Sequence, residues 1–443
     1  MRVRRPRVIR FLQEAERFQW RSAEEVRRLQ WLLLKTVLSS ACENVPFYRD
    51  WFKSQGMNIR DIVTPADFRR LPILTKEILR SQSVGLRSEI SRGKVIENYT
   101  GGSTGEPTTF YQDDVYVDWG EALTIRHNRW AGWEFGERTV YLWGADRDLN
   151  KTRNSVGRWY SQHFKREVLL NSFDLDGTRL GSFYNEIIHF NPRIIIGYAS
   201  ALTFFARYVH DGGRPWPVKL RGIISAAETL DEYQRTLIES VFQCTVFNRY
   251  GSRDMGLMAS QCQVGSGLHI CADNVYLEVL RPGGEPALPG ELGEVVVTGL
   301  NNFAMPLIRF AIGDVAAVDE DRTCACGRGL PLLQFVKGRV SDLLVTPAGK
   351  FVHGEYFTHL FYGKRWVDRF QVIQDVRDAI GVRIMASAKP DPREIESLRR
   401  EIVDHLGPEM HVTIEFVDQI PVTPTGKYRF TLSHLPPAAF KGT

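Results

Sequence analysis

Residues 193–254 decide the fold of this 443-residue chain, because short apolar runs alternate there with longer amphipathic ones. The segment reads RIIIG (193–197), YASALTFFARYVHDGGRPWPVK, LRGIIS (220–225), AAETLDEYQRTLIESVFQC, TVFN (245–248) and RYGSRD (249–254). The three apolar runs predict buried strands, and residues 230–242 predict a helix between the last two. This alternation is typical of an α/β fold, in which largely parallel sheets are covered by helices.

Residues outside this segment extend it into a large domain followed by a small one. Residues 139–143 predict another buried strand, residues 15–41 an amphipathic helix, and residues 267–299 a β-rich subdomain. Beyond residue 340, strands at 370–374, 382–385 and 411–417 and a helix at 394–405 predict a separate α+β unit. We expect an N-terminal domain over residues 1–340 and a small C-terminal α+β domain over residues 341–443.

Composition excludes several classes of protein. The hydrophobic share of 43% and the charged share of 25% are those of an ordinary globular protein. The most apolar stretch, residues 194–206, is too short to span a membrane, and no secretory signal begins the chain. We therefore expect a cytoplasmic protein whose six cysteines are thiols or metal ligands.

The net charge of +5 is concentrated at the N-terminus. The first ten residues contain no acid and five arginines, namely Arg2, Arg4, Arg5, Arg7 and Arg10, and the remainder of the chain is balanced. A nucleic-acid-binding protein would spread basic charge over a face of its fold, so we expect no nucleic-acid partner. The pattern predicts a short basic arm whose deletion leaves the activity of the body nearly unchanged.

The most informative motif is YTGGSTGEPT at residues 99–108. Its glycines and hydroxyl residues could wrap a polyphosphate with backbone N–H groups and side-chain hydroxyls. It lacks the lysine of a Walker A loop, and a plain turn is the alternative interpretation.

Four further motifs follow along the chain. In NRYGSRD (248–254), the Tyr-Gly pair could lie beside a base and Asp254 could hold Mg²⁺. IRFAIGD (308–314) ends in Asp314, which could bind ribose hydroxyls, and GRVSD (338–342) marks the domain boundary. PVTPTGKYR (421–429) presents Lys427 on a rigid loop, where it could neutralise a reacting phosphate. Taken singly, each could be an ordinary turn or a solvated loop.

The five motifs together, in this order, resemble those of the adenylate-forming superfamily of acyl-CoA synthetases, peptide-synthetase adenylation domains and luciferases. The resemblance runs from about residue 44 to residue 429. Within the superfamily, the chain is most similar to the branch of phenylacetate–CoA ligase, coenzyme F390 synthetase and CapK-type capsule-biosynthesis proteins.

The resemblance implies the roles of individual residues. ATP would be bound by Thr100, Gly101, Gly102, Ser103, Thr104, Gly105, Ala227, Glu228, Asn248, Tyr250, Gly251, Asp314 and Arg339. The glycine-rich loop would hold the phosphates, Tyr250 would stack on adenine and Asp314 would bind the ribose. Lys427 and Asp254 would be catalytic, Asp254 through Mg²⁺, with a hinge at Ser341 and Asp342. Trp143, Tyr198 and Ala226 would line an acyl pocket, with Trp130 and Tyr141 as further candidates for the pocket or the core.

The sequence departs from the superfamily pattern at three of these motifs. Thr108 stands where a lysine often follows the loop. Arg253 stands where a threonine usually precedes the acid, and the acid itself is Asp254 rather than a glutamate. The changes at these two motifs are compatible with this branch. Ser341 occupies the usual position of the hinge acid, with Asp342 one residue later, so the pivot is open.

The implied reaction activates a small, aromatic or otherwise unsaturated carboxylic acid with ATP and Mg²⁺ and passes the acyl group to coenzyme A. AMP and pyrophosphate are released. Alternatives are an amine, a carrier-protein thiol or a cofactor hydroxyl as the acceptor, and a non-catalytic binding protein on the same fold. Intact Lys427, Asp254 and Asp314 argue against the last. The oligomeric state is open, with a homodimer among the options.

A metal site is a separate prediction. Cys262, His269, Cys324 and Cys326 supply three thiolates and an imidazole, a sufficient set for a tetrahedral, structural zinc ion. Cys271 competes with His269 for this role, and reduced cysteines beside a core histidine are the alternative. The CACGR string at 324–328 resembles the zinc ligands of some members of the branch.

Overall fold

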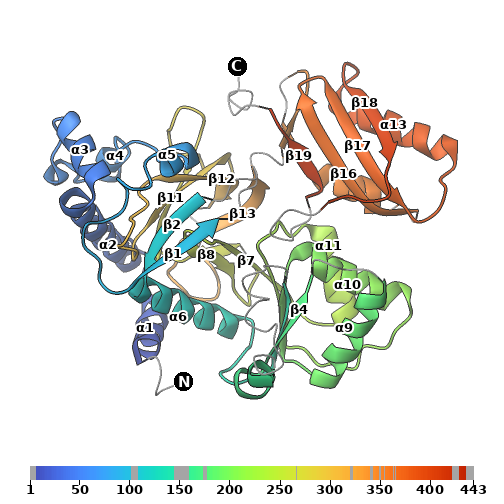
Figure 1. The fold of residues 1–443 in the computed structure, drawn as a ribbon, viewed down its shortest axis with the longest axis horizontal. Helices are drawn as coiled ribbons and strands as arrows, with labels where there is room; N and C mark the ends of the chain where they lie inside the picture. Colours follow the sequence, from blue (N-terminus) through green and yellow to red (C-terminus); the bar gives the residue numbers. More distant parts are fainter. Residues whose placement is uncertain are drawn as a thin grey trace.

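The computed structural model describes residues 6–100, 108–143, 159–172, 177–265, 267–319, 323–339, 343–348, 351–353, 355–362, 364, 366–421 and 429–435. Its largest element is an eleven-stranded sheet with strand order β10-β11-β12-β13-β9-β8-β7-β6-β5-β3-β4 (Figure 1). The parallel half contains β3 (Thr139–Trp143), β4 (Glu167–Asn171), β5 (Ile194–Gly197), β6 (Gly222–Ala226) and β7 (Val246–Ser252). The antiparallel half contains β8 (Gly256–Gln261), β9 (Leu268–Ile270), β10 (Val275–Leu280), β11 (Leu292–Gly299), β12 (Phe310–Val318) and β13 (Leu332–Arg339).

The parallel half forms because its strands are apolar on both faces, as expected of strands covered by helices. Every residue of β5 and of β6 is buried. The helices of this part are α6 (Asp114–Trp130), α9 (Gly177–Phe190), α10 (Ala199–Asp211) and α11 (Glu232–Phe242), with the short η2 (Ser161–Lys165) before β4. In Figure 1, α9, α10 and α11 form one group beside the parallel strands. The predicted α/β class with a β-rich part is confirmed.

Strand β7 joins the two halves. It pairs in parallel with β6 and antiparallel with β8. Gly251 makes the tight β7–β8 hairpin possible, because a Cβ atom there would lie 2.7 Å from the carbonyl oxygen of Gly256.

A separate two-stranded hairpin lies over the sheet (Figure 1). It consists of β1 (Val95–Thr100) and β2 (Thr108–Asp113), and its strands pair from Val95 with Asp113 to Thr100 with Thr108. Asp113 ends the hairpin and caps α6, because its Oδ1 accepts a hydrogen bond from the Tyr116 backbone N–H at 2.7 Å.

The C-terminal residues form their own four-stranded sheet, in the order β18-β17-β16-β19. Its elements are β16 (Val367–Val376), β17 (Ala379–Ala386), α13 (Pro392–Leu406), β18 (His411–Phe416) and β19 (Thr431–Ser433), preceded by β14 (Leu343–Val345), β15 (Phe351–His353) and α12 (Glu355–Tyr362). A hydrophobic cluster that includes Phe357, Phe370 and Leu398 fills the space between this sheet and its helices. The sequence patterns missed the short strand β19, which pairs in parallel with β16.

The predicted helix over residues 15–41 is two helices, so that prediction is wrong. The chain forms α1 (Pro6–Phe18) and α2 (Ala23–Asn44), followed by α3 (Pro46–Ser54), η1 (Ile59–Asp61), α4 (Pro65–Phe68) and α5 (Lys76–Ser81). Ser22 starts α2 through a capping box. Its hydroxyl accepts a hydrogen bond from the Glu25 N–H at 3.2 Å, and the Glu25 carboxylate accepts one from the Ser22 N–H at 3.2 Å.

The basic arm predicted over residues 1–10 is also wrong for residues 6–10, which form the first turns of α1. Val8 is 2% exposed and packs in a hydrophobic cluster with residues of α6. Arg7 forms ion pairs with Asp114 at 2.7 Å and Asp118 at 2.9 Å. Residues 1–5 lie outside the described residues. The arm was predicted from the five arginines. The apolar residues between them, such as Val8, were not considered.

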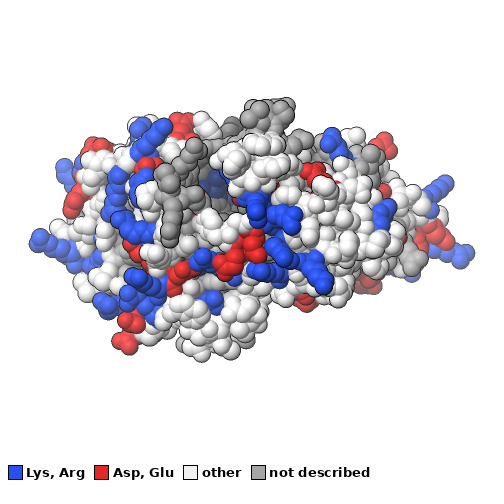
Figure 2. Space-filling view, turned by 90° about the horizontal axis from the view of Figure 1, so that it is seen from below, with Lys and Arg blue, Asp and Glu red and all other residues white. Residues whose placement is uncertain are grey.

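Charge is mixed on the face of the molecule in Figure 2, where basic and acidic side chains lie beside one another. Among the described residues, no helix is both long enough and apolar enough to cross a bilayer.

We predict that Val8→Ala destabilises the protein by about 1–2 kcal/mol, because it removes buried methyl groups from the contact between α1 and α6. Urea unfolding followed by circular dichroism measures the change. Arg10→Ala is the matched control in the same helix, where the arginine side chain is 65% exposed. Equal stability of the two variants would show that α1 does not pack as described.

Candidate functional site

Tyr250 and Asp314, which come from two separate motifs, meet in the structure. The Tyr250 hydroxyl donates a hydrogen bond of 2.7 Å to Oδ2 of Asp314. Tyr250 lies in β7 and Asp314 in β12, where the register pairs Asp314 with Arg339 of β13. The structure thus brings together the motifs that contain Tyr250, Asp314 and Arg339. For Arg339 this holds for the backbone, because its side chain lies outside the described part of the structure.

The residues predicted to contact adenine lie beside this group. Ala226 ends β6 and pairs with Arg249 in β7, next to Tyr250. Ala227 has a φ of +67°, a left-handed conformation that costs energy in a residue with a Cβ atom. The Glu228 carboxylate accepts a hydrogen bond of 2.8 Å from the backbone N–H of Ser200 in α10. The 226–228 turn is therefore held in one shape at the carboxyl edge of the parallel strands.

Asp254 lies in the turn between β7 and β8, and it is 6% exposed. Its Oδ1 accepts hydrogen bonds from the Ser252 hydroxyl and from the Met255 N–H, the latter at 3.1 Å. Within the described residues, these bonds orient the carboxylate and leave Oδ2 without a hydrogen bond. An oriented carboxylate with a spare oxygen fits Mg²⁺, which binds proteins through one or two carboxylates and keeps several waters.

Other predicted site residues lie outside the described residues. They are Gly101, Gly102, Ser103, Thr104 and Gly105 of the glycine-rich loop, Ser341 and Asp342 of the predicted hinge, and Lys427. The loop connects β1 to β2, whose last paired residues are Thr100 and Thr108. The hairpin therefore carries the loop.

The three residues predicted to line the acyl pocket lie at the ends of adjacent strands. Trp143 ends β3 and Tyr198 follows β5, and their ring centroids are 4.3 Å apart. Tyr198 is 2% exposed, and Ala226 at the end of β6 is 8% exposed. Trp130, a further candidate, lies elsewhere, with its ring centroid 5.7 Å from that of His269.

Cys262, His269, Cys324 and Cys326 form one cluster, and their ligand atoms all lie within 4.8 Å of one another. The Sγ atoms of Cys262 and Cys324 are 3.6 Å apart, and Nε2 of His269 is 3.3 Å from Sγ of Cys326. Cys271 does not join them, because its Sγ lies 3.7 Å from Nε2 of His127. Of the two candidates for the fourth ligand, His269 is the one in the cluster.

Burial sets the protonation of these groups. It lowers the pKa of His269 to about 4, so the imidazole is neutral near pH 7. Nδ1 of His269 lies 3.4 Å from the Leu330 carbonyl oxygen and Nε2 faces the thiols, which is the orientation of a metal-binding imidazole. Burial also raises the pKa of Cys262 to about 11. A metal would therefore have to displace protons from the thiols.

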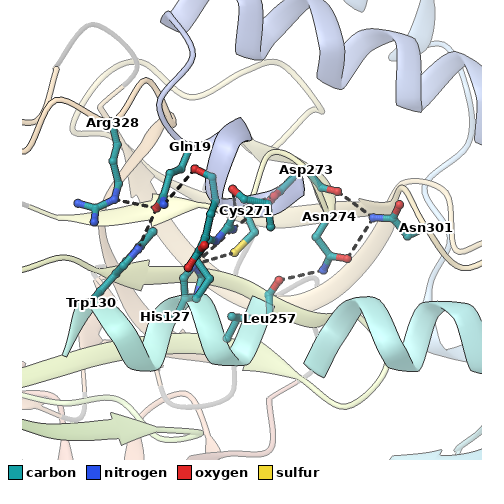
Figure 3. A network of polar contacts seen from close by, with 12 residues as sticks. Gln19, His127, Trp130, Leu257, Cys271, Asp273, Asn274, Asn301 and Arg328 are labelled. Atoms are coloured by element: carbon teal, nitrogen blue, oxygen red, sulfur yellow. Dashed lines mark hydrogen bonds and ion pairs between the residues drawn. The ribbon is translucent and has the colours of Figure 1, made fainter. Parts of the chain in front are cut away.

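Sequence reasoning missed the polar network next to this cluster (Figure 3). Oε1 of Gln19 accepts hydrogen bonds from Nε1 of Trp130 and Nε of Arg328, both at 2.9 Å. The Arg328 guanidinium also lies over the Trp20 ring at 4.7 Å and the Trp130 ring at 4.5 Å. Arg328 follows the Cys-x-Cys-Gly string directly, so the only signal in the sequence was an arginine beside two cysteines.

Comparisons with known proteins identify chains that are similar to this one in sequence and fold. A family model described as the CapK C-terminal domain matches residues 344–434. The chain is 25% identical to protein CapK of Staphylococcus aureus, over 89% of this chain and 86% of that protein. It is also 25% identical to a phenylacetate-coenzyme A ligase of Thermus thermophilus, over 92% of this chain and 96% of that one.

Among solved structures, a 2-hydroxyisobutyryl-CoA ligase in the postadenylation state, in complex with R3-HIB-AMP, superposes with a TM-score of 0.75 at 19% identity. The match covers 96% of this chain and 93% of that one. At this identity the superposition establishes the fold. The motifs, the family model and the relatives over nearly the full length point in one direction: the chain is similar to CapK and the phenylacetate–CoA ligases, and its fold is that of an adenylate-forming CoA ligase.

Proposed function

We propose that the protein activates a small, aromatic or otherwise unsaturated carboxylic acid with ATP and Mg²⁺ as an acyl-adenylate, and that it transfers the acyl group to coenzyme A. AMP and pyrophosphate are the other products. The observation that carries the proposal is the hydrogen bond of 2.7 Å between Tyr250 and Asp314, which joins the predicted adenine and ribose contacts. Phenylacetate-coenzyme A ligases among the relatives support this reaction class.

Each site residue has a role in this reaction. Tyr250 would stack on adenine opposite the 226–228 turn, and Asp314 would accept hydrogen bonds from the ribose hydroxyls. The glycine-rich loop would hold the β- and γ-phosphates. Mg²⁺, when held by Asp254, would supply positive charge against the phosphate oxygens.

Catalysis would consist of positioning and charge neutralisation. A carboxylate is a poor electrophile, and its adenylate is a mixed anhydride from which AMP is a good leaving group. The acid's oxygen attacks the α-phosphorus, the bond to pyrophosphate breaks, and Lys427 would stabilise charge on the α-phosphate as this happens. The thiol of coenzyme A then attacks the acyl carbon and displaces AMP.

We also propose that the chain divides into domains at residues 1–340 and 341–443, with the pivot at Ser341 or Asp342. The separate C-terminal sheet with its own hydrophobic cluster supports this division, as does the start of the CapK C-terminal match at residue 344. Movement of the small domain would withdraw Lys427 after adenylation and admit the acceptor. We also propose a cytoplasmic location, in keeping with the six cysteines, all of which are free thiols.

The Cys/His cluster is proposed to bind one structural zinc ion. Three thiols and one imidazole whose ligand atoms lie within 4.8 Å of one another suit tetrahedral coordination. Four protein ligands leave no position for a substrate, so the ion would stabilise the fold. It would hold the loop of Cys324 and Cys326, and through Arg328 it would support the junction of α1 and α2 at Gln19.

We predict that Lys427→Ala abolishes acid-dependent pyrophosphate release, with a fall of at least about a hundredfold, because charge on the α-phosphate loses its partner. Binding of MgATP should survive, since its main contacts lie in the N-terminal domain. Lys389→Ala, which removes an exposed lysine of the C-terminal part, should retain full activity. If Lys427→Ala formed adenylate at the wild-type rate, the assignment of this lysine would be wrong.

We predict that the purified protein contains about one zinc ion per chain, and that Cys324→Ser loses it and unfolds at a lower temperature. Mass spectrometry of the metal and thermal unfolding provide the readouts. Cys271→Ser is the matched control, a buried cysteine outside the cluster, and should retain the metal. A metal-free wild-type protein, or zinc loss in Cys271→Ser with retention in Cys324→Ser, would exclude the site as drawn.

A further inference from the structure

An arginine of the C-terminal sheet lies over an aromatic ring of the N-terminal part of the chain. The guanidinium carbon of Arg369 in β16 is 5.1 Å from the centroid of the Phe204 ring in α10. At this distance a cation is attracted to the face of an aromatic ring. In Figure 1, β16 lies directly above the group formed by α10 and α11. The contact therefore joins two parts of the molecule that have separate sheets.

A shift of register in β16 turns Arg369 toward α10. The pairing of β16 with β17 is irregular between Val367 and Arg369. Val367 belongs to the hydrophobic cluster of the C-terminal sheet, and so do Phe370 and Val372. The residues that face this cluster thus change from odd to even numbers across the irregularity. In a regular strand, Arg369 would share the face of Val367 and point into the cluster.

Gln371 lies on the same face of β16 as Arg369, because it is two residues further along the strand. It is 4% exposed, and its Nε2 donates a hydrogen bond of 3.0 Å to the carbonyl oxygen of Arg429. Arg429 follows Lys427 by two residues in the sequence. The face of the sheet that meets α10 is therefore also the face that holds the chain just after the predicted catalytic lysine.

Helix α10, on the other side of the contact, begins beside the predicted adenine and acyl contacts. Tyr198 precedes the helix, and the Ser200 N–H in its first turn donates the hydrogen bond to Glu228 of the 226–228 turn. Phe204 is four residues after Ser200, which is about one helical turn. A contact on Phe204 thus sets the position of the C-terminal sheet relative to the candidate site.

We propose that Arg369 is a positioning residue whose contact with Phe204 holds the C-terminal domain at the active site while the acyl-adenylate forms. The inference rests on the proposed function, in which Lys427 serves adenylation and the C-terminal domain then moves before coenzyme A reacts. Movement of the domain separates Arg369 from Phe204, so the contact stabilises the adenylation position alone. Loss of the contact should disfavour adenylation without slowing transfer to coenzyme A.

The test is Arg369→Ala in the full-length protein, with the two half-reactions measured separately. The acid is the most active one among benzoate, phenylacetate, cinnamate and 4-hydroxybenzoate. We expect the single-turnover rate of pyrophosphate release without coenzyme A to fall by about two- to fivefold, the effect of losing an exposed cation–ring interaction. The rate at which coenzyme A consumes preformed adenylate should stay at the wild-type value or rise. Arg369→Lys, which keeps a cation, should retain most of the adenylation rate.

A double-mutant cycle separates this contact from any other role of the two residues. Phe204→Leu keeps an apolar side chain but removes the ring, and it should slow adenylation to a similar extent. The combination of Arg369→Ala with Phe204→Leu should be no slower than either single variant, because both substitutions remove the same interaction.

The matched control is Arg214→Ala. The Arg214 guanidinium carbon lies 3.8 Å from the centroid of the Tyr208 ring, which also belongs to α10. Both members of this pair are in the N-terminal part of the chain. Its loss removes an interaction of the same kind from the same helix, and it should leave the ratio of the two half-reaction rates unchanged.

Three results would overturn the inference while the proposed function stands: a wild-type adenylation rate in Arg369→Ala, an equal fall in both half-reactions, or additive losses in the double variant. The same change of ratio in Arg214→Ala would overturn it as well. A wild-type protein that releases no pyrophosphate with any of the four acids would contradict the proposed function and the inference with it. A selective, non-additive loss of adenylation in the Arg369 and Phe204 variants supports the assignment.

Discussion

The site depends on the position of β7, which pairs in parallel with β6 on one side and antiparallel with β8 on the other. The parallel pairing places the end of β7 beside the 226–228 turn, and the antiparallel pairing forces the chain back at Gly251 and Asp254. Strand β12 is not a neighbour of β7 in the sheet, yet Asp314 meets Tyr250. The sheet must therefore curl until its antiparallel half faces the carboxyl edge of its parallel half.

Much of the α/β framework could be predicted, because buried strands leave a strong local signal. The run at residues 194–197 is apolar throughout and is buried throughout. The 226–228 motif begins at the last residue of β6, whereas the motif at 248–254 covers the end of β7 and the turn after it, because β7 runs four residues beyond the predicted strand. The N-terminus was mispredicted for a different reason. The capping box of Ser22 and Glu25, which starts α2, can be recognised in the sequence. The apolar residues keep their helical spacing across it, so the pattern predicted one helix instead of two. The Arg7–Asp114 ion pair joins residues 107 apart, a contact that no local pattern reveals.

The residues of the candidate site differ in the same respect: some left a signal in the local sequence and others did not. The Cys/His ligand set was predicted from side-chain chemistry, since few residue types bind zinc, and from the resemblance of the CACGR string to zinc ligands of the branch. The structure brings those four residues together. The contact of Gln112 in β2 left no comparable signal in the sequence. Its side-chain amide faces the backbone carbonyl oxygens of Arg253 and Asp254, and every residue carries such an oxygen. Gln19 was hidden for a related reason. It bridges Trp130 and Arg328 across the fold, and a glutamine at a helix end predicts no such partner.

The most direct test of the account is a pyrophosphate-release assay of the wild-type protein with a panel of small carboxylic acids, with and without coenzyme A. We predict that at least one acid releases pyrophosphate from MgATP before coenzyme A is added, and that coenzyme A then yields AMP and the acyl thioester in continuous turnover. Formation of ADP and phosphate, or release of pyrophosphate with none of the acids under either condition, would contradict it.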